Sequence, residues 1–287
     1  MYDKRVQWIY TSIDTLLSIV RIIILTHFKK TKQIQKKHDK CFLFGNGPSL
    51  LTAIQKYEST FSDYDLIAVN QMAVTDLFEK YKPSIYILAD PAYWYEEGYE
   101  DLFYQADELF EALTEKTNWE LQLYMPYQAN IQQVIGKLRT NSNIKIVFYN
   151  KTTFYGFNKI AYFVYNRQWG MVRPQNILCP ALMLLIYSKY QTIYLAGANS
   201  DWMKNIWVDE KNQLRLQDEH YYFEEQQNGL VLPCSMDEQC ISLYYAFNGY
   251  KEIHKYALSK KIKIYNTYKH SFIDAFEKIE NLTTEYK

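Results

Sequence analysis

The sequence is poor in cysteine and carries no excess charge of either sign. Its four cysteines include no CxxC pair and have no histidine cluster nearby, which argues against a zinc site. We expect reduced thiols in a cytoplasmic protein, because disulfides are rare in that compartment. Lys and Arg together number 32, as do Asp and Glu, so no overall field recruits nucleic acid.

The amino end lacks the pattern of a cleavable signal peptide, in which a small-residue cleavage site follows a short apolar region. Residues 5–27 instead carry an apolar stripe at helical spacing, made of Val6, Ile9, Ile13, Leu16, Leu17, Val20, Ile23 and Ile24. Asp14 and Arg21 interrupt the segment. Because each charge near the centre of a bilayer costs about 2.5–3.5 kcal/mol, we do not expect this helix to span a membrane.

A cluster of lysines follows the stripe directly, as residues 29–37 read KKTKQIQKK. An apolar helix beside such a cluster suits a helix that lies on an anionic leaflet through residues 5–37. The alternative is a helix packed on the domain or on a second subunit of a homo-oligomer, followed by a solvated charge run. We therefore expect an amphipathic helix and basic linker at 1–39, on a protein peripheral to the inner face of the cytoplasmic membrane.

From residue 40 onward, short apolar runs alternate with helical patterns. The sequence predicts strands at 41–45, 64–71, 84–91, 119–126, 144–150, 192–197 and 262–266, and a closing helix at 271–280. Strands that are nearly continuous apolar runs are typical of a parallel sheet covered on both faces. We expect residues 40–287 to form one Rossmann-like α/β domain.

The alternating pattern fails between about residues 199 and 238. This stretch is rich in charges and aromatic residues and has little periodicity. A loop of that length inside a compact enzyme is typically an active-site lid, and its aromatic residues favour partial order. We expect a lid insertion here.

Ligands of open parallel sheets bind outside the carboxyl ends of the strands. Four predicted strands end there in small or polar residues, namely Gly45, Asn46, Gly47 and Ser49, then Asn70 and Gln71, then Asp90, and finally Gly197, Asn199 and Asp201. The first turn is neither a GxGxxG fingerprint nor a P-loop, because no lysine follows its glycines. Glycines at the start of a helix nevertheless leave room for a phosphate on backbone N–H groups. The alternative is a structural turn in which Ser49 caps the helix.

Two further motifs have competing interpretations. His220, in the predicted lid, is a candidate proton acceptor at neutral pH, and a solvated surface histidine is the alternative. Asp63-Tyr64-Asp65 has the DxD spacing that can hold Mn²⁺. Because it precedes its strand, it falls at the amino end of the sheet, and we expect it to be structural. We expect neither a resident metal nor a cofactor.

The order of these motifs resembles the bacterial lipooligosaccharide sialyltransferases. The shared features are GNGPSL at 45–50, VNQ at 69–71, LAG at 195–197 and a lid histidine, scattered over roughly residues 40–280. The resemblance implies an inverting, metal-independent transfer from a nucleotide-activated sugar, with a CMP-sugar of sialic acid or a relative favoured. It implies a glycan or lipid-linked acceptor in surface polysaccharide synthesis.

The same resemblance implies roles for individual residues. Asn46, Gly47 and Ser49 would contact the nucleotide and its phosphate, Asn70 the nucleotide or sugar, and His220 would be the base. Arg173 and Asn176 stand just before the apolar helix, where the family has an arginine and a small polar residue.

Asp90 departs from the uncharged residue that is usual in the family. An acidic side chain close to the donor disfavours a sugar that carries its own carboxylate. Two other functions fit the GNGPSL start. A pterin diphosphokinase-like enzyme would use ATP and Mg²⁺ held by Asp90 and Asp201, and a non-catalytic nucleotide-sugar-binding protein would not need His220.

Overall fold

The computed structural model describes residues 4–95, 100–217 and 229–282, and its centre is an eight-stranded parallel sheet. The strand order is β11-β10-β6-β1-β2-β3-β4-β5, and every neighbouring pair is parallel. The strands are β1 (Lys40–Phe44), β2 (Asp65–Val69), β3 (Ile85–Ile87), β4 (Leu121–Pro126), β5 (Ile144–Tyr149), β6 (Thr192–Ala196), β10 (Lys263–Asn266) and β11 (Glu277–Lys278). The predicted α/β fold is confirmed.

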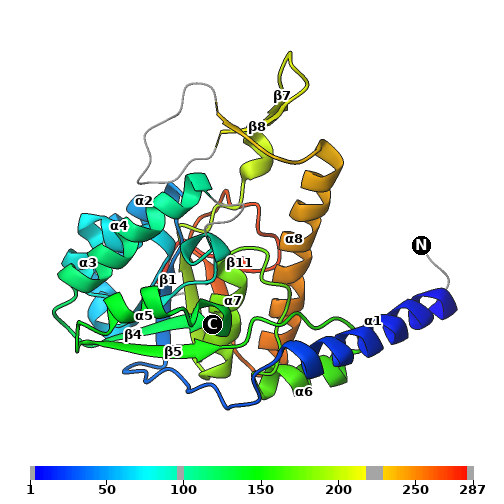
Figure 1. The fold of residues 1–287 in the computed structure, drawn as a ribbon, viewed down its shortest axis with the longest axis horizontal. Helices are drawn as coiled ribbons and strands as arrows, with labels where there is room; N and C mark the ends of the chain where they lie inside the picture. The colour runs from blue at the N-terminus through cyan, green and yellow to red at the C-terminus, as the bar shows by residue number, and fades with distance from the viewer. Residues whose placement is uncertain (1–3, 96–99, 218–228, 283–287) are drawn as a thin grey trace.

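Helices cover both faces of this sheet (Figure 1). Successive residues of β1 divide between two cores, with Cys41 and Leu43 in one and Phe42 and Phe44 in the other, because strand side chains alternate between faces. One core also takes residues of α2 (Ser49–Tyr57), α3 (Asp76–Tyr81), α4 (Glu100–Lys116) and α5 (Gln132–Leu138). The other takes residues of α6 (Asn158–Asn166), α7 (Leu178–Tyr187) and α8 (Met236–Ser259).

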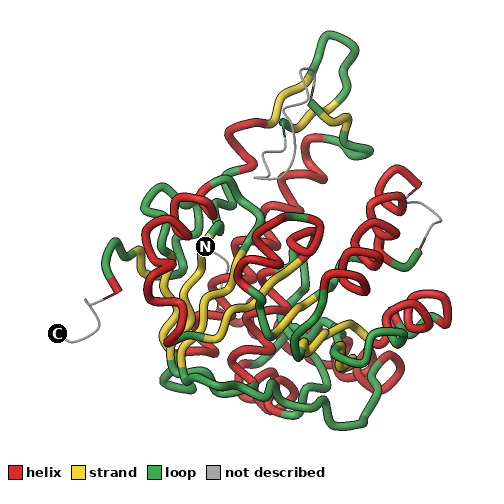
Figure 2. Tube along the Cα trace, turned by 90° about the vertical axis from the view of Figure 1, so that its left-hand side faces the viewer, coloured by secondary structure: helices red, strands yellow, loops and turns green. Residues whose placement is uncertain are grey.

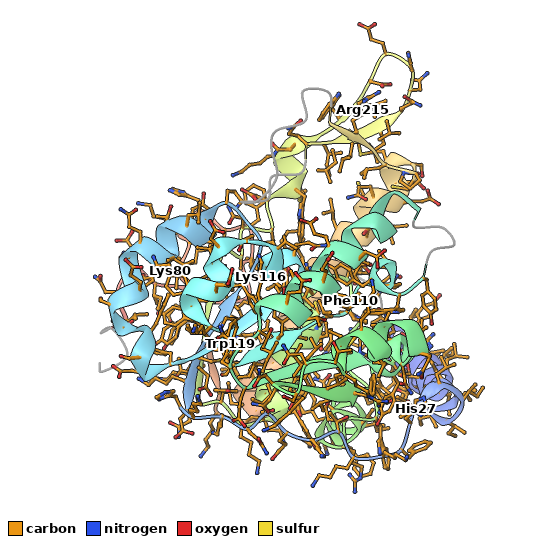
Figure 3. The ribbon with its side chains drawn as sticks, turned by 60° about the vertical axis from the view of Figure 1, so that its left-hand side comes forward. His27, Lys80, Phe110, Lys116, Trp119 and Arg215 are labelled. Carbon is orange, nitrogen blue, oxygen red and sulfur yellow. The ribbon has the colours of Figure 1, made fainter. Side chains whose placement is uncertain are left out.

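Two side-chain hydrogen bonds join the end of α4 and the residues after it to the segments around β2 and β3. Trp119 Nε1 donates to the Pro83 carbonyl at 2.8 Å, and Lys116 Nζ donates to the Ala73 carbonyl at 3.2 Å (both side chains are labelled in Figure 3). Phe110 of α4, also labelled there, is buried in the core on this face of the sheet. These contacts hold the β2–β3 side of the sheet in place.

The chain order reverses beside β1, which pairs with β2 on one side and β6 on the other. After β5 the chain crosses back to enter β6, and β10 and β11 extend the sheet beyond it. In doubly wound folds the crevice at such a reversal is the usual ligand site. The fold therefore directs attention to the carboxyl ends of β1 and β6.

The predicted lid contains a small antiparallel sheet that stands away from the body (Figures 1 and 2). Its strands are β7 (Ile206–Val208), β8 (Leu214–Leu216) and β9 (Leu230–Val231). Arg215 and Asp209 join the first two strands by an ion pair of 2.6 Å, and this pairing lowers the pKa of the Asp209 carboxyl (Figure 3 labels Arg215). Residues 218–228 of the predicted lid, which include His220, lie outside the described residues.

The predicted closing helix at 271–280 is wrong, because the chain forms β11 there. Ile273, Phe276 and Ile279 are buried, and their three-residue spacing is the spacing of a helical stripe. The irregular segment buries the same three residues, so the spacing does not distinguish it from a helix. The Ser271 hydroxyl accepts from Ile273 N at 3.1 Å, and Lys278 Nζ donates to Ser271 O at 2.6 Å. Those local bonds favour a turn, and Glu277 then pairs with Tyr265 at the sheet edge.

The helix α1 (Lys4–Leu25) packs on the body through its polar side. Thr15 Oγ1 accepts from Phe157 N at 3.1 Å, and Ser18 Oγ accepts from Tyr155 N at 2.9 Å. Gly156 fits between them because a Cβ there would lie 2.8 Å from Thr15 Cα. The polar residues thus supply acceptors to backbone N–H groups of the domain.

The apolar stripe of α1 consequently faces outward. Ile13 is 47% exposed, Leu16 64% and Ile24 71%, and the rest of the stripe from Ile9 onward is exposed as well. The helix therefore packs on the domain, as one of the two interpretations expected, but through its polar side and not through the stripe. The helix is also long and apolar enough to cross a membrane by length and composition, with a mean hydropathy of 1.6.

Candidate active site

A cavity of about 390 Å³ lies at the carboxyl ends of the central strands. It is lined by most of the residues expected at a ligand site, namely Gly45, Asn46, Gly47, Asn70, Asp90, Asn176, Gly197, Asn199 and Asp201. Trp202, Asn205 and Gln217 add a wall from the lid. Residues that follow five strands, residues of the turn before α7 and residues of the lid therefore meet around one space, as the parallel topology requires.

The glycines of the first turn are required by a close contact with the loop after β6. A Cβ on Gly45 would lie 2.6 Å from Gly197 O, and a Cβ on Gly197 would lie 2.6 Å from Gly45 O. Gly197 also has φ +74°, a conformation that favours glycine. Gly45 N donates to Ala196 O at 2.7 Å and Gly47 N to Gly197 O at 2.9 Å. The two strand-end loops are thus packed backbone against backbone.

Asn199 completes this contact from the β6 side. Its Oδ1 accepts from both the backbone N–H of Ser49, at 3.3 Å, and the Ser49 hydroxyl. The amide oxygen thereby accepts from a backbone N–H at the amino end of α2, a role that the alternative interpretation of the turn gave to the Ser49 side chain. The Ser49 capping prediction is wrong, because Ser49 is the first residue of α2 and directs its hydroxyl to Asn199.

The loop that carries Asn199 is itself held from β10. Asn266 Nδ2 donates to Ala198 O at 3.0 Å, the Ser271 hydroxyl donates to the same oxygen at 2.7 Å, and Phe272 N donates to Asn199 O at 2.9 Å. These donors leave the loop little freedom to move. The irregular segment after β10 therefore has a role in placing the site.

These hydrogen bonds affect the predicted phosphate site at the start of α2. The N–H of Gly47 and both donors of Ser49 are directed to Gly197 and Asn199 rather than to the cavity. Ser49 is not among the residues that line the cavity, and neither is Gln71, which is buried behind it. The contact of Gly47 and Ser49 with a phosphate stays a prediction. It requires these donors to exchange their present partners for the ligand.

Asn70 presents an unusual polar atom to the cavity. Its backbone is left-handed, with φ +50°, and its carbonyl accepts from the Tyr86 hydroxyl at 2.5 Å. Its side-chain Oδ1 is buried and has no partner among the described residues. A buried acceptor without a donor is costly, so this position is suited to a ligand that brings an N–H or O–H group.

Lys151 is the one basic residue that lines the cavity within the described chain, and sequence reasoning missed it. It follows β5, so the strand-end rule would have found it if applied to that strand. Its Nζ donates to Ala89 O at 3.1 Å and lies 5.4 Å from the Trp94 ring centre. Burial lowers its pKa, and the nearby charge of Asp90 partly opposes that shift.

Asp90 thus lies near a cation inside the cavity. Its Oδ1 also accepts from Ala92 N at 3.0 Å, which caps the short helical turn Pro91–Tyr93. Asp201, the other carboxylate of the cavity, pairs with Lys204 at 3.2 Å. The sequence argument that Asp90 repels a carboxylate-bearing sugar is weakened, because Lys151 offsets part of its charge.

The structure separates Arg173 from the other predicted residues. Arg173 lines a second, larger cavity, whereas Pro174, Gln175 and Asn176 line the first. Asn176 Nδ2 donates to the buried Tyr250 hydroxyl at 2.8 Å, and that hydroxyl lies 3.0 Å from Ser200 Oγ. Residues 174–176 therefore form the wall between the two cavities, with Arg173 on its far side.

The DxD sequence lies at the amino end of the sheet, away from the first cavity, as its position before the strand predicts. Asp65 begins β2 at the amino end of the sheet and is buried. It accepts from the Tyr190 hydroxyl at 2.5 Å and from Lys37 N at 3.0 Å. Among the described residues, no three His, Cys, Asp or Glu side chains cluster in a way that could hold a metal ion.

Comparison with known proteins shows likeness of fold only. No family model and no curated protein matches the chain. A MAf glycosyltransferase from Magnetospirillum magneticum matches over 96% of this chain with a TM-score of 0.51 and 10% identity. This chain covers 39% of that protein.

Two alpha-2,3-sialyltransferase structures from Campylobacter jejuni also match, with TM-scores of 0.42 and 0.39. Their identities to this chain are 16% and 13%, and each match covers 87% of this chain and 83% of the other. The likeness of fold rests on the match to the MAf glycosyltransferase, of which this chain resembles a part.

The contact between the two loops can be tested with Gly47→Ala. A Cβ there would lie 2.5 Å from Asn199 Oδ1 and 2.8 Å from Gly197 O. We expect the free energy of unfolding, measured by urea denaturation, to fall by about 1–3 kcal/mol, as for other overpacked sites. Combining it with Asn199→Ala should cost less than the sum of the two single changes, because the side chain nearest the new methyl group is gone.

Gly136→Ala in α5 is the matched control, because nothing lies within 4 Å of its Cβ position. That change should leave stability unchanged or raise it by up to about 1 kcal/mol. A Gly47→Ala protein as stable as the original chain would contradict the packing role assigned to this glycine.

Proposed function

We propose that this protein is a glycosyltransferase that moves a sugar from a nucleotide-activated donor to a glycan or lipid-linked acceptor. The main observation behind the proposal is the first cavity, which lies where the chain order reverses between β1 and β6. Polar residues from several strand ends meet there beside the predicted lid. A fold shared with a MAf glycosyltransferase supports it. The order of sequence motifs favours a CMP-sugar donor, sialic acid or a relative, and surface polysaccharide synthesis.

The donor would lie across the ends of β1, β2 and β6. The buried Oδ1 of Asn70 suits a hydroxyl or amino group of the sugar or nucleoside. We assign contact with the base or ribose to Asn46, because it is buried and lines the cavity. The cavity volume of about 390 Å³ falls in the range of small-molecule sites.

The departing phosphate needs positive charge. When the anomeric carbon–oxygen bond breaks, its electron pair stays on the phosphate oxygen and the phosphate gains negative charge. We assign the stabilisation of that charge to Lys151, since Arg173 lies in the other cavity. A buried ammonium acts more strongly on a developing charge than an exposed one, because water screens it less.

The attacking group is an acceptor hydroxyl, which forms the new bond to the anomeric carbon on the face opposite the phosphate. Such an attack inverts the configuration and releases the hydroxyl proton. We propose His220 as the base that receives this proton, on the strength of its place in the lid sequence. No step of this scheme requires a metal ion.

We also propose that α1 holds the protein on an anionic membrane surface. Its polar side is bonded to the domain, so its orientation is fixed with the apolar stripe outward. Lys29, Lys30 and Lys32 are exposed just after the helix. The segment that follows α1 runs along the bottom of the molecule in Figure 1. Apolar burial and attraction to anionic lipid would then act together.

The donor class is tested by thermal shift with CMP-, UDP- and GDP-sugars, each with and without EDTA. We expect one CMP-sugar to raise Tm with no effect of EDTA. Lys151→Gln should weaken nucleotide binding by about ten- to a hundredfold, the size of a charge-assisted hydrogen bond, and Lys151→Arg should weaken it less. If only ATP with Mg²⁺ stabilises the protein, the result would instead support the pterin diphosphokinase-like function.

The lowered pKa of Lys151 predicts a pH dependence for the same binding. The ammonium attracts phosphate below its pKa, so affinity should fall as pH rises through that value, at a lower pH than for an exposed lysine. The Lys151→Arg protein should keep its affinity across this range, because arginine stays protonated.

The base is tested with His220→Ala. We expect turnover to drop by about 10²–10⁴-fold while the nucleotide-induced thermal shift stays the same, because only proton transfer is lost. His254→Ala is the control, since that histidine lies in α8 and lines neither cavity. Unchanged turnover in the His220 variant would remove this residue as the base.

Membrane binding is tested by sedimentation with vesicles that contain phosphatidylglycerol. We expect the protein to co-sediment, less at high salt, and Leu17→Glu with Ile24→Glu to abolish this by placing charges in the apolar stripe. The Leu51→Glu protein, changed at an exposed leucine of α2, should bind as before. If the α1 changes instead dissociate a dimer and leave vesicle binding intact, the stripe is a subunit interface.

A further inference from the structure

The second cavity lies between α1, α6 and α8 and measures about 1150 Å³. Much of its wall is aromatic and includes Trp8, Tyr155, Phe157, Tyr162, Tyr244 and Tyr245. Tyr244 is 63% exposed, and Tyr155, Tyr162 and Tyr245 are partly exposed, so these rings are not filled core positions. Figure 1 shows the three helices that bound the space, with α1 passing below α8 and beside α6.

One hydrogen-bonded pair connects the lining of this cavity to the lining of the candidate active site. Arg173 Nε donates to Gln175 Oε1 at 2.9 Å, with Arg173 in the second cavity and Gln175 in the first. Gln175 Nε2 also donates to Ser242 Oγ on α8 at 2.8 Å. The guanidinium carbon lies 4.0 Å from the Tyr245 ring centre. A ligand in the second cavity would therefore end beside the place where chemistry is proposed.

The charges around the second cavity favour an anion. Glu252 pairs with Lys255 at 2.7 Å, which leaves Arg173, Lys4 and Lys159 against the one carboxylate of Asp14 among the described lining residues. A guanidinium stacked on a ring keeps its fork of N–H donors, and that fork matches a carboxylate or phosphate. Tyrosine combines an apolar ring with a polar hydroxyl, which suits a ligand with both kinds of surface.

From this geometry we propose that the second cavity is the acceptor site and that it binds an oligosaccharide bearing an acidic group. The proposal rests on the transferase function proposed above. Aromatic rings pack against the C–H faces of the sugars, and Arg173 binds the carboxylate or phosphate nearest the active site. Arg173 then positions the acceptor and does not stabilise the leaving phosphate.

The position of α1 fits this role. Trp8, Thr11 and Asp14 face the cavity, whereas Ile9, Ile13 and the rest of the stripe face outward. One helix thus forms the cavity wall on one side and the proposed membrane contact on the other. An acceptor glycan joined to a lipid would enter the cavity directly from the membrane surface.

Two matched pairs of oligosaccharides test the proposal. One pair ends in glucuronic acid or glucose, and the other in mannose 6-phosphate or mannose, so that carboxylate and phosphate are distinguished. Binding to the full chain is measured by saturation-transfer NMR and titration calorimetry. We expect an acidic member to bind at least about tenfold more tightly than its neutral partner, the least that one charge-assisted hydrogen bond contributes.

Variants then locate the binding site. Tyr245→Ala should weaken both members of a pair, and Arg173→Gln should weaken the acidic member alone. If the Tyr245→Ala protein does not fold, Tyr244→Ala replaces it in this test, because Tyr244 is exposed. Arg167→Gln and Phe163→Ala are the controls, because they form a similar stacked pair at 3.7 Å that lines neither cavity. In a transfer assay, Arg173→Gln should raise the acceptor KM and leave kcat nearly unchanged.

The outcomes separate this inference from the proposed function. If nucleotide binding persists but no oligosaccharide binding responds to the Tyr245, Tyr244 or Arg173 changes, the acceptor site is wrong and the transferase proposal stands. If Arg173→Gln lowers kcat or nucleotide affinity with the acceptor KM unchanged, Arg173 serves the leaving phosphate and the inference is overturned. If no nucleotide binds the first cavity, the proposed function itself fails.

Discussion

The contact between the loop after β1 and the loop after β6 is the constraint on which the site depends. Gly45 and Gly197 each lie where the other's backbone leaves no room for a side chain. Asn199 then satisfies the start of α2 in place of a side chain of that helix. Because β1 and β6 flank the reversal of the sheet, joining their loops sets the floor of the cavity and the direction of α2 together.

This constraint changes the meaning of the glycine turn. A glycine at a strand end indicates that something approaches the backbone closely, and here a second loop of the same chain does so. The cavity is formed by the joined loops, and its polar character comes from neighbours such as Asn70 and Lys151. The charge balance between Lys151 and Asp90 is a property of the assembled site, since the two residues are 61 positions apart in the chain.

The first helix shows a similar division of roles. Its polar residues face the protein because they supply acceptors to backbone N–H groups around Gly156, which the domain leaves without strand partners. Its apolar residues face outward as a result. The same helix borders the second cavity, so one element relates the proposed membrane surface to the proposed acceptor site.

The sequence by itself determined the parallel α/β fold, because continuous apolar strands alternating with helices have few other arrangements. Most of the residues that it identified as a ligand site do line the first cavity, since parallel strands deliver their carboxyl ends to one edge. Only the tertiary structure decided the partner of Ser49, the separation of Arg173 from the first cavity, the proximity of Lys151 to Asp90, and the outward face of α1. Each of these depends on which distant segment lies opposite a residue, and local periodicity carries no information about that.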